Sequence, residues 1–169
     1  TFKYKPDKFR VVERRMRATD PALHRVISNV KNGVPTVFDI TLLLMKMPYF
    51  RGFNGLLMSQ LVGKMDILKL QEGYESTLLK EQDVYILVGG YLQLSNPGHN
   101  QTIYMNAGDV FGTAFIGENT QGWRLDVDQN SFALRFNIND MFNVLTNQRL
   151  MAQRLMQSIR EGLSEKKLQ

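Results

Sequence analysis

The carboxylates of one short segment are the side chains with the clearest capacity for chemistry. Asp126 and Asp128 stand two residues apart in a run with the alternation of a β-strand, so their side chains would lie on the same face. Such a pair could bind a metal ion or share a proton. No histidine and no third carboxylate stands close by, so a solvated strand face is the favoured interpretation.

Other catalytic chemistry finds no support in the residue types. The chain of 169 residues has no cysteine and two histidines, His24 and His99. This excludes thiol nucleophiles, disulfides and iron–sulfur or zinc-thiolate sites, and two histidines are too few for a multi-histidine metal site. No serine stands in a nucleophile-elbow motif, and no P-loop or Gly-x-Gly-x-x-Gly pattern occurs. We predict a non-catalytic domain without metal or cofactor.

Helices are predicted in the first third of the chain. Thr19 or Asp20 can cap a first helix, because a proline follows at the first helical position. Apolar residues at helical spacing predict a second helix over 37–47 and a third over 56–64.

After these helices the pattern changes to short β-like runs separated by turn residues. Strands that recur about every 8–12 residues are typical of a β-sandwich or barrel. The expected strands are 67–70, 76–79, 84–88, 91–94, 101–105, 124–128 and 133–138.

Helical spacing returns after Asn139, which can cap a long C-terminal helix. Met151, Leu155 and Ile159 lie one above another on this helix. Such an apolar stripe can cover its own barrel or pair with a second copy of the chain, and the sequence leaves both interpretations open.

Positive charge is concentrated at the N-terminus. Residues 1–17 carry seven Lys and Arg and two acidic residues. The net charge of this segment, +5, equals the formal net charge of the whole chain. Such an arm can contact phosphate backbones or acidic lipid head groups. A solvated or intramolecular segment is favoured, because no recognition helix accompanies the charge. A nucleic-acid partner is not expected, and peripheral membrane contact through the arm stays open.

Length and apolar content indicate a single domain. The longest apolar runs fall far short of the ~18 residues that span a bilayer. The N-terminus has no apolar signal-peptide core and begins at Thr1. We therefore expect a cytoplasmic, intracellular domain, and a chain that is either trimmed or a fragment of something larger.

Five segments together resemble the cyclic-nucleotide-binding domain family. They are 44–53, 69–73, 84–92, the turn 107–112 with the sequence AGDVFG, and 132–145. The resemblance implies a mainly β fold, an antiparallel, jelly-roll-like β-roll with N-terminal helices and a long C-terminal helix. The expected divisions are a basic arm (1–18), N-terminal helices (19–64), the β-roll (65–138) and the C-terminal helix (139–169).

The ligand-binding segment departs from the pattern that the resemblance implies. The family has a glutamate directly after Phe-Gly for the ribose, and an arginine followed by two small residues for the cyclic phosphate. Thr113 stands at the glutamate position and Trp123 at the arginine position, with Arg124 one residue late. A one-residue shift on a strand sends a side chain to the opposite face. Because a buried phosphate needs a paired cation, we predict that cyclic AMP and cyclic GMP do not bind in the usual way.

Two interpretations of the site follow. The aromatic residues 85, 111, 115 and 123 can fill the roll, which is the favoured interpretation. They can instead line an apolar pocket for another anionic small molecule. The candidate ligand-binding residues are then Gly112, Thr113, Ala114, Trp123 and Arg124, with Glu118 as a further polar anchor.

We therefore predict a regulatory or assembly domain that acts through protein–protein contacts of its flanking helices. Its partner would be another protein, another domain of a larger protein, or a second copy paired through the C-terminal helix. The alternative is a sensor domain that binds a small anionic ligand in a modified pocket.

Overall fold

The computed structural model describes most of the chain from residue 35 onward. The described residues are 25, 28, 29, 32, 35–71, 75, 76, 82–96, 98, 100–112, 115, 122–127 and 129–167. Some sequence predictions fall outside this range. They concern the basic arm (1–18), the helix start at Thr19 and Asp20, His24, His99, Thr113, Ala114, Glu118 and Asp128.

In the part of the chain described from residue 35 onward, three helical segments precede the roll. The helix α3 (Val37–Met45) begins at a capping box, in which Thr36 Oγ1 accepts the Asp39 N–H and Asp39 Oδ2 accepts the Thr36 N–H, each at 3.1 Å. The short 3-10 helix η1 (Pro48–Phe50) and the helix α4 (Gly55–Val62) follow. Both predicted helices of this region are therefore confirmed, with ends that differ by one or two residues.

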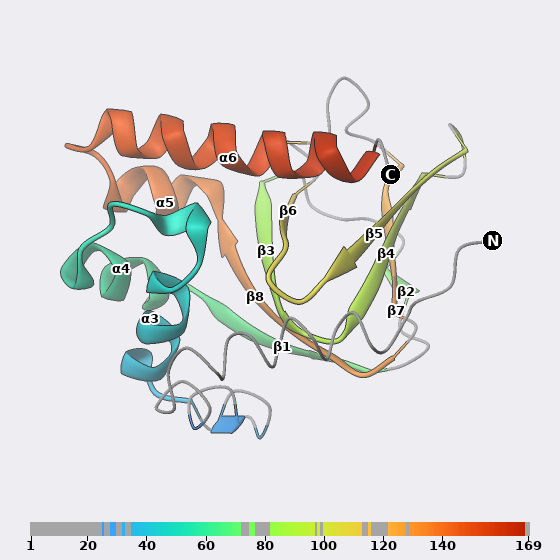
Figure 1. Ribbon diagram of the computed structural model, residues 1–169, viewed down its shortest axis with the longest axis horizontal. Helices are drawn as coiled ribbons and strands as arrows, with labels where there is room; N and C mark the ends of the chain where they lie inside the picture. Colours follow the sequence, from blue (N-terminus) through green and yellow to red (C-terminus); the bar gives the residue numbers. More distant parts are fainter. Residues whose placement is uncertain are drawn as a thin grey trace.

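Two four-stranded antiparallel sheets form the roll, with strand orders β1-β8-β3-β6 and β2-β7-β4-β5 (Figure 1). The antiparallel β-roll with flanking helices is confirmed. The strand β6 was not predicted, because two residues are too few to show alternation. The strands are β1 (Asp66–Leu70), β2 (Glu75–Ser76), β3 (Asp83–Gly89), β4 (Tyr91–Asn96), β5 (Gln101–Asn106), β6 (Val110–Phe111), β7 (Arg124–Val127) and β8 (Ser131–Asn137).

The corner between β3 and β4 requires a glycine. Gly90 has φ +97°, and a Cβ added to it would lie 2.6 Å from Ser131 Cα. The Ser131 hydroxyl accepts a hydrogen bond from the Tyr91 N–H at 3.0 Å. This close approach ties β4 of one sheet to β8 of the other.

The C-terminal segment is two helices, α5 (Ile138–Val144) and α6 (Arg149–Lys167), and the prediction of one continuous helix capped by Asn139 is wrong. The cap is Asn137, whose side chain accepts the Asn139 N–H at 2.8 Å. The break follows α5, where the Thr146 hydroxyl donates to the carbonyl oxygens of residues 142 and 143. This side chain satisfies carbonyl groups that a continuing helix would bond through backbone N–H groups.

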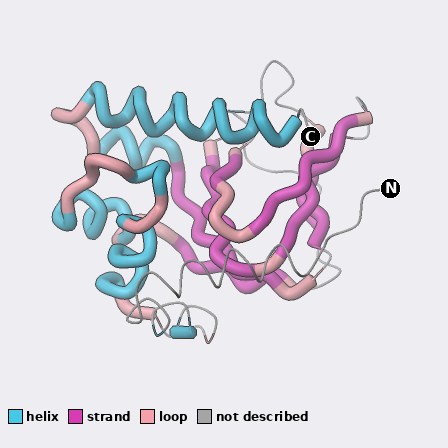
Figure 2. Tube along the Cα trace, in the orientation of Figure 1, coloured by secondary structure: helices cyan, strands magenta, loops and turns pink. Residues whose placement is uncertain are grey.

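The apolar stripe of α6 is buried in its own domain. Leu155 and Ile159 of the predicted stripe are buried, and Met151 is partly buried against the same core, to which the buried Ala152 and Leu163 also belong. Figures 1 and 2 show α6 lying along the roll, with α3, α4 and α5 gathered at one end. Of the two interpretations of the stripe, the structure shows the one in which it covers its own roll. Within the described residues, no helix is long and apolar enough to cross a bilayer.

Candidate functional site

The candidate ligand segment joins the two sheets. Gly112 directly follows β6 of one sheet, whereas Arg124 begins β7 of the other, with Trp123 just before it. Thr113, Ala114 and Glu118 lie outside the described residues. The structure therefore places three of the five candidate residues, with Gly112 beside the first sheet and Trp123 and Arg124 at the start of β7 in the second.

Gly112 sits in a space too tight for any side chain. A Cβ added there would lie 2.8 Å from the Asp83 carbonyl oxygen and 3.3 Å from the Phe115 ring. The Phe115 N–H donates to the Gly112 carbonyl at 3.1 Å, which folds the ring back toward the glycine. The glycine is thus required by close packing.

A cation from the C-terminal helix lies over this aromatic ring. Arg160 Cζ on α6 is 5.8 Å from the centroid of the Phe115 ring, within cation–π range. Phe115 is buried between the turn and the helix. Sequence reasoning missed this contact, since nothing in the local pattern links residues 45 positions apart.

The aromatic residues of the segment are buried in the core. Trp123 is 1% exposed, and Tyr85 stacks on Phe111 with ring centroids 5.1 Å apart. All three belong, with Phe115, to one hydrophobic cluster. The burial of the four rings supports the interpretation in which aromatic side chains fill the roll.

Arg124 lies on the opposite face of β7 from Trp123. Burial alternates along this strand, with Leu125 and Val127 inside and Arg124 and Asp126 partly exposed. The side chain of Arg124 is 43% exposed. The one-residue shift noted in the sequence has the structural consequence expected of a strand.

Arg124 is engaged by polar groups on the outer face of the sheet. Its Nε donates to Ser95 Oγ at 3.2 Å and lies 3.6 Å from Asp126 Oδ2. Ser95 Oγ in turn donates to Asp126 Oδ2 at 3.1 Å. The guanidinium is therefore held in a surface network with Asp126, the carboxylate considered above for metal or proton chemistry. Among the described residues, no three acidic or histidine side chains gather as a metal site.

The end of α6 is fastened to the turn between β5 and β6. Lys166 Nζ lies 2.7 Å from Asp109 Oδ2, and the same carboxylate oxygen accepts the Asn106 N–H at 2.7 Å. Both side chains of the ion pair are largely buried, which strengthens it relative to a fully exposed pair. The sequence places Asp109 within the turn 107–112, and nothing in the local pattern links it to Lys166.

Tyr49 of η1 forms a second contact with α6. A Cβ added to Gly162 would lie 2.6 Å from the Tyr49 hydroxyl oxygen, so the helix approaches the tyrosine closely because it has a glycine there. Burial raises the pKa of Tyr49 above its ordinary value, and the negative charges of Asp109 and Glu165 raise that pKa further. A hydrogen bond from the Val110 backbone acts in the opposite direction.

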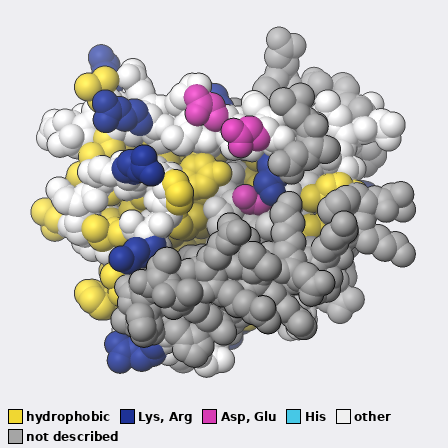
Figure 3. Space-filling model, viewed as in Figure 1, with side chains coloured by type: hydrophobic (Ala, Val, Ile, Leu, Met, Phe, Trp, Pro, Cys, Tyr) yellow, Lys and Arg dark blue, Asp and Glu magenta, His cyan; other side chains and the backbone are white. Residues whose placement is uncertain are grey.

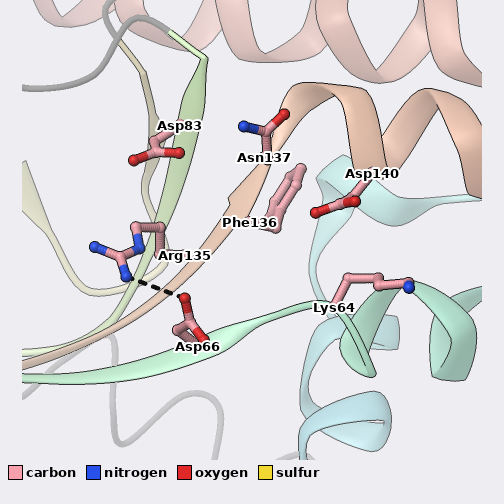
Figure 4. Close-up of a pocket in the computed structure, with 7 residues that line it drawn as sticks. All are labelled: Lys64, Asp66, Asp83, Arg135, Phe136, Asn137 and Asp140. Carbon is pink, nitrogen blue, oxygen red and sulfur yellow. Dashed lines mark hydrogen bonds and ion pairs between the residues drawn. The ribbon is translucent and has the colours of Figure 1, made fainter.

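A separate polar cleft lies where the helices meet the first sheet (Figure 4). Arg135 Nη2 donates to Asp66 Oδ2 at 3.0 Å across its floor, and this hydrogen bond is the main cause that raises the pKa of Arg135. The Arg135 cation is therefore already paired with Asp66. The cleft has both positive and negative side chains, and its arginine is not free to bind an anion. Its volume is about 170 Å³, and it is lined by Lys64, Asp66, Asp83, Arg135, Phe136, Asn137 and Asp140.

Comparisons with known proteins find solved structures with a similar fold, but no match at the level of sequence families. No protein-family model matches the chain, and no curated protein matches it. The sensor domain of the transcriptional regulator DNR from Pseudomonas aeruginosa matches with a TM-score of 0.61 and 17% identity, over 76% of this chain and 91% of that one.

Two further solved structures share the architecture. The C-linker/CNBHD of zELK channels, crystallized in the presence of cAMP, matches with a TM-score of 0.53 and 14% identity, over 76% of this chain and 69% of that one. The cAMP-bound PfPKA-R (141–441) matches with a TM-score of 0.54 and 14% identity, over 74% of this chain and 45% of that one. At these identities the likeness concerns the fold.

Proposed function

We propose that this chain, which has the fold of the cyclic-nucleotide-binding domains, is a non-catalytic regulatory or assembly domain. It does not bind cyclic AMP or cyclic GMP in the usual way, and it acts through protein–protein contacts of its flanking helices. The structural neighbours are sensor and regulatory domains, which supports a regulatory role. Fold alone does not carry ligand binding, which depends on the site.

The placement of Trp123 and Arg124 carries the proposal. Trp123 occupies the position at which the resemblance implies a phosphate-binding arginine, and it is buried in the core. The neighbouring Arg124 points to the outer face, where Ser95 and Asp126 engage it. A cyclic phosphate drawn into the roll would leave its charge without this cation, which would cost several kcal/mol, of the order of 3–5, and most of its affinity.

The seating of α6 supports a domain that is already closed. Leu155, Ile159 and Leu163 of α6 are buried. Arg160 covers Phe115, and Lys166 is paired with the β5–β6 turn. A ligand changes the position of an element only if it binds the two positions with different affinity. Here protein side chains already make the contacts inside the roll. The flanking helices therefore respond to partners that bind their outer surface.

The outer face of α6 is the surface best suited to such partners. Gln153, Gln157 and Glu161 lie one above another on the helix and are exposed, and Gln157 Nε2 donates to Glu161 Oε1 at 3.0 Å. These side chains are polar and free of any role in holding the helix to the roll. They therefore provide a contact stripe that a partner can use without displacing α6.

A second candidate function is a sensor for an anionic small molecule, and Arg160 favours it. Its guanidinium lies over Phe115, whose backbone bonds to Gly112 at the start of the candidate segment. An anion bound at this segment would pair with the Arg160 cation on α6. The resemblance implies instead an arginine on the strand. Binding would then be coupled directly to the helix.

Calorimetric titration with cyclic AMP, cyclic GMP and cyclic di-GMP tests both candidates. Wild type, Arg124→Ala and Arg160→Ala are compared, because one arginine lies on the outer face and the other lies beside the segment. We expect no saturable heat with any nucleotide or variant. Binding that is lost only in Arg160→Ala would establish the sensor, and binding lost only in Arg124→Ala would contradict the placement of that residue.

The protein-contact part of the proposal has its own test. Partners captured from cell extract are compared between wild type and a Gln153→Arg/Gln157→Arg variant, with Lys69→Glu on the exposed edge strand β1 as the matched control. We expect a defined partner that the α6 variant loses and the control keeps. A partner set identical in all three proteins would contradict the assignment of the contact to α6.

A further inference from the structure

The large apolar side chains that remain exposed are concentrated on the helices. Among the described residues, seven are exposed, and only Ile67 of β1 lies on a strand. Phe38 and Leu56 are each 69% exposed and Leu150 is 68% exposed. The other three are Val37, Met45 and Phe142.

These side chains belong to helices that form one end of the molecule. The helix α3 packs on α4, and α4 packs on α5. Figure 1 shows these three helices together with the start of α6 at the end of the roll. Phe38 and Met45 are two helical turns apart, so they share one side of α3. In Figure 3, hydrophobic side chains emerge at separate points over this end.

The same end carries an excess of positive charge. The exposed basic residues of these helices and their flanks are Lys46, Arg51, Lys64, Arg149 and Arg154. Among the described residues, α3, α4 and α5 carry two acidic residues, α6 carries Glu161 and Glu165 in its second half, and Asp66 lines the same cleft as Lys64. Asp39 is buried in the capping box of α3, and Asp140 is partly exposed on α5. In the view of Figure 3, Lys and Arg side chains accompany the hydrophobic ones over the helices, and the acidic side chains lie toward the other half of α6.

We propose that this helical end is a docking face for an anionic membrane surface. Exposed aromatic and aliphatic side chains insert into the boundary between head groups and acyl chains, and Lys and Arg side chains contact the anionic head groups. Stable peripheral binding generally needs two signals, and this face supplies both apolar side chains and positive charge.

Charge and geometry favour a membrane over the other occupants. A second copy docked through the same face would bring like charges together, which is unfavourable. A partner helix needs a continuous apolar groove, whereas Phe38, Leu56 and Leu150 come from three different helices. A bilayer surface accepts side chains that project separately.

Vesicle co-sedimentation of the full chain tests this docking face. The vesicles are phosphatidylcholine alone and phosphatidylcholine with phosphatidylserine, each at low and at physiological salt. Two variants change the face, Phe38→Glu/Leu150→Glu and Arg149→Glu/Arg154→Glu. The matched control, Ile67→Glu/Lys69→Glu, makes one apolar and one basic substitution on the exposed strand β1.

We expect wild type and control to bind the anionic vesicles and to release them as salt rises. Each face variant should lower the partition coefficient about tenfold or more, with unchanged circular dichroism because all substituted side chains are exposed. Equal binding by every variant would overturn the assignment, because the N-terminal arm would then carry the contact. No binding to vesicles, together with face-dependent binding of an acidic amphipathic peptide, would overturn it in favour of a protein partner. These outcomes do not depend on whether the roll binds a nucleotide.

Discussion

Lys166, in the last turn of α6, and Asp109, in the turn between β5 and β6, form an ion pair of 2.7 Å that closes the C-terminal helix over the roll. The two residues are 57 positions apart in sequence. Lys166 follows Leu163, the last residue of the buried stripe, so the ion pair fixes the end of the helix. The helix is thereby held at three levels, by the stripe, by Arg160 over Phe115, and by this pair.

Breaking the ion pair should loosen the end of α6. A double-mutant cycle with Lys166→Ala and Asp109→Ala isolates the pair from the turn contact that Asp109 makes with Asn106. We expect a coupling energy of about 1 kcal/mol, since both side chains are largely buried. Hydrogen exchange should quicken in the last turns of α6. Arg154→Ala, on the exposed side of the same helix, is the control. A coupling energy near zero would mean that the stripe alone seats the helix.

The Tyr49 hydroxyl should prevent the stabilisation that an alanine at position 162 would otherwise give. An alanine within a helix is favoured over glycine by about 1 kcal/mol, but its Cβ would lie 2.6 Å from the Tyr49 hydroxyl oxygen. We expect Gly162→Ala to give no gain in the free energy of unfolding of wild type. In the Tyr49→Phe background, where the hydroxyl is absent, the same substitution should stabilise by about 1 kcal/mol. An equal gain in both backgrounds would show that the approach of α6 to η1 is not close.

Alkaline pH should destabilise the contact between η1 and α6. Burial raises the pKa of Tyr49 in the folded state, and Asp109 and Glu165 add to this. A raised folded pKa means that the contribution to stability is fully present below the ordinary tyrosine value and is lost as the pH rises through the folded value. The free energy of unfolding should therefore fall above about pH 10. Tyr49→Phe should make that fall less steep, as measured by urea unfolding, and an unchanged slope would contradict the assignment.

Trp123 should tolerate an aromatic side chain but not a cation. Trp123→Arg puts a charge where the structure has a fully buried ring, and we expect a loss of at least about 3 kcal/mol in the free energy of unfolding. Trp123→Phe should cost less. Arg124→Ala, on the outer face, should cost about 1 kcal/mol or less. A stable Trp123→Arg protein that binds cyclic AMP would instead reveal a pocket that needs only its arginine.

The sequence was sufficient for the roll because its signals are local. Turns such as the one at Gly90 and the alternation along β7 are properties of a few adjacent residues, and they predict strands and corners directly. The break after α5 was missed because it depends on Thr146, a side chain with no strong helix-stopping preference. The strand β6 was missed because its two residues are too few to show alternation.

The candidate site was only partly predictable for the same reason. Adjacent residues on a strand face opposite sides, so the sequence could indicate that Trp123 and Arg124 separate. It could not indicate what engages Arg124, because Ser95 comes from a neighbouring strand. The contacts of Arg160 and Lys166 with the roll depend on the path of α6 after the break.

The fluorescence of Trp123 during titration with cyclic AMP and cyclic GMP tests the central claim most directly. Trp123 is the single tryptophan of the chain, and it stands at the position where the resemblance implies the phosphate contact. With a buried ring there and Arg124 held on the outer face by Ser95 and Asp126, the emission should stay constant up to millimolar nucleotide. A saturable shift of the emission at micromolar nucleotide, abolished by unfolding the protein, would contradict the account.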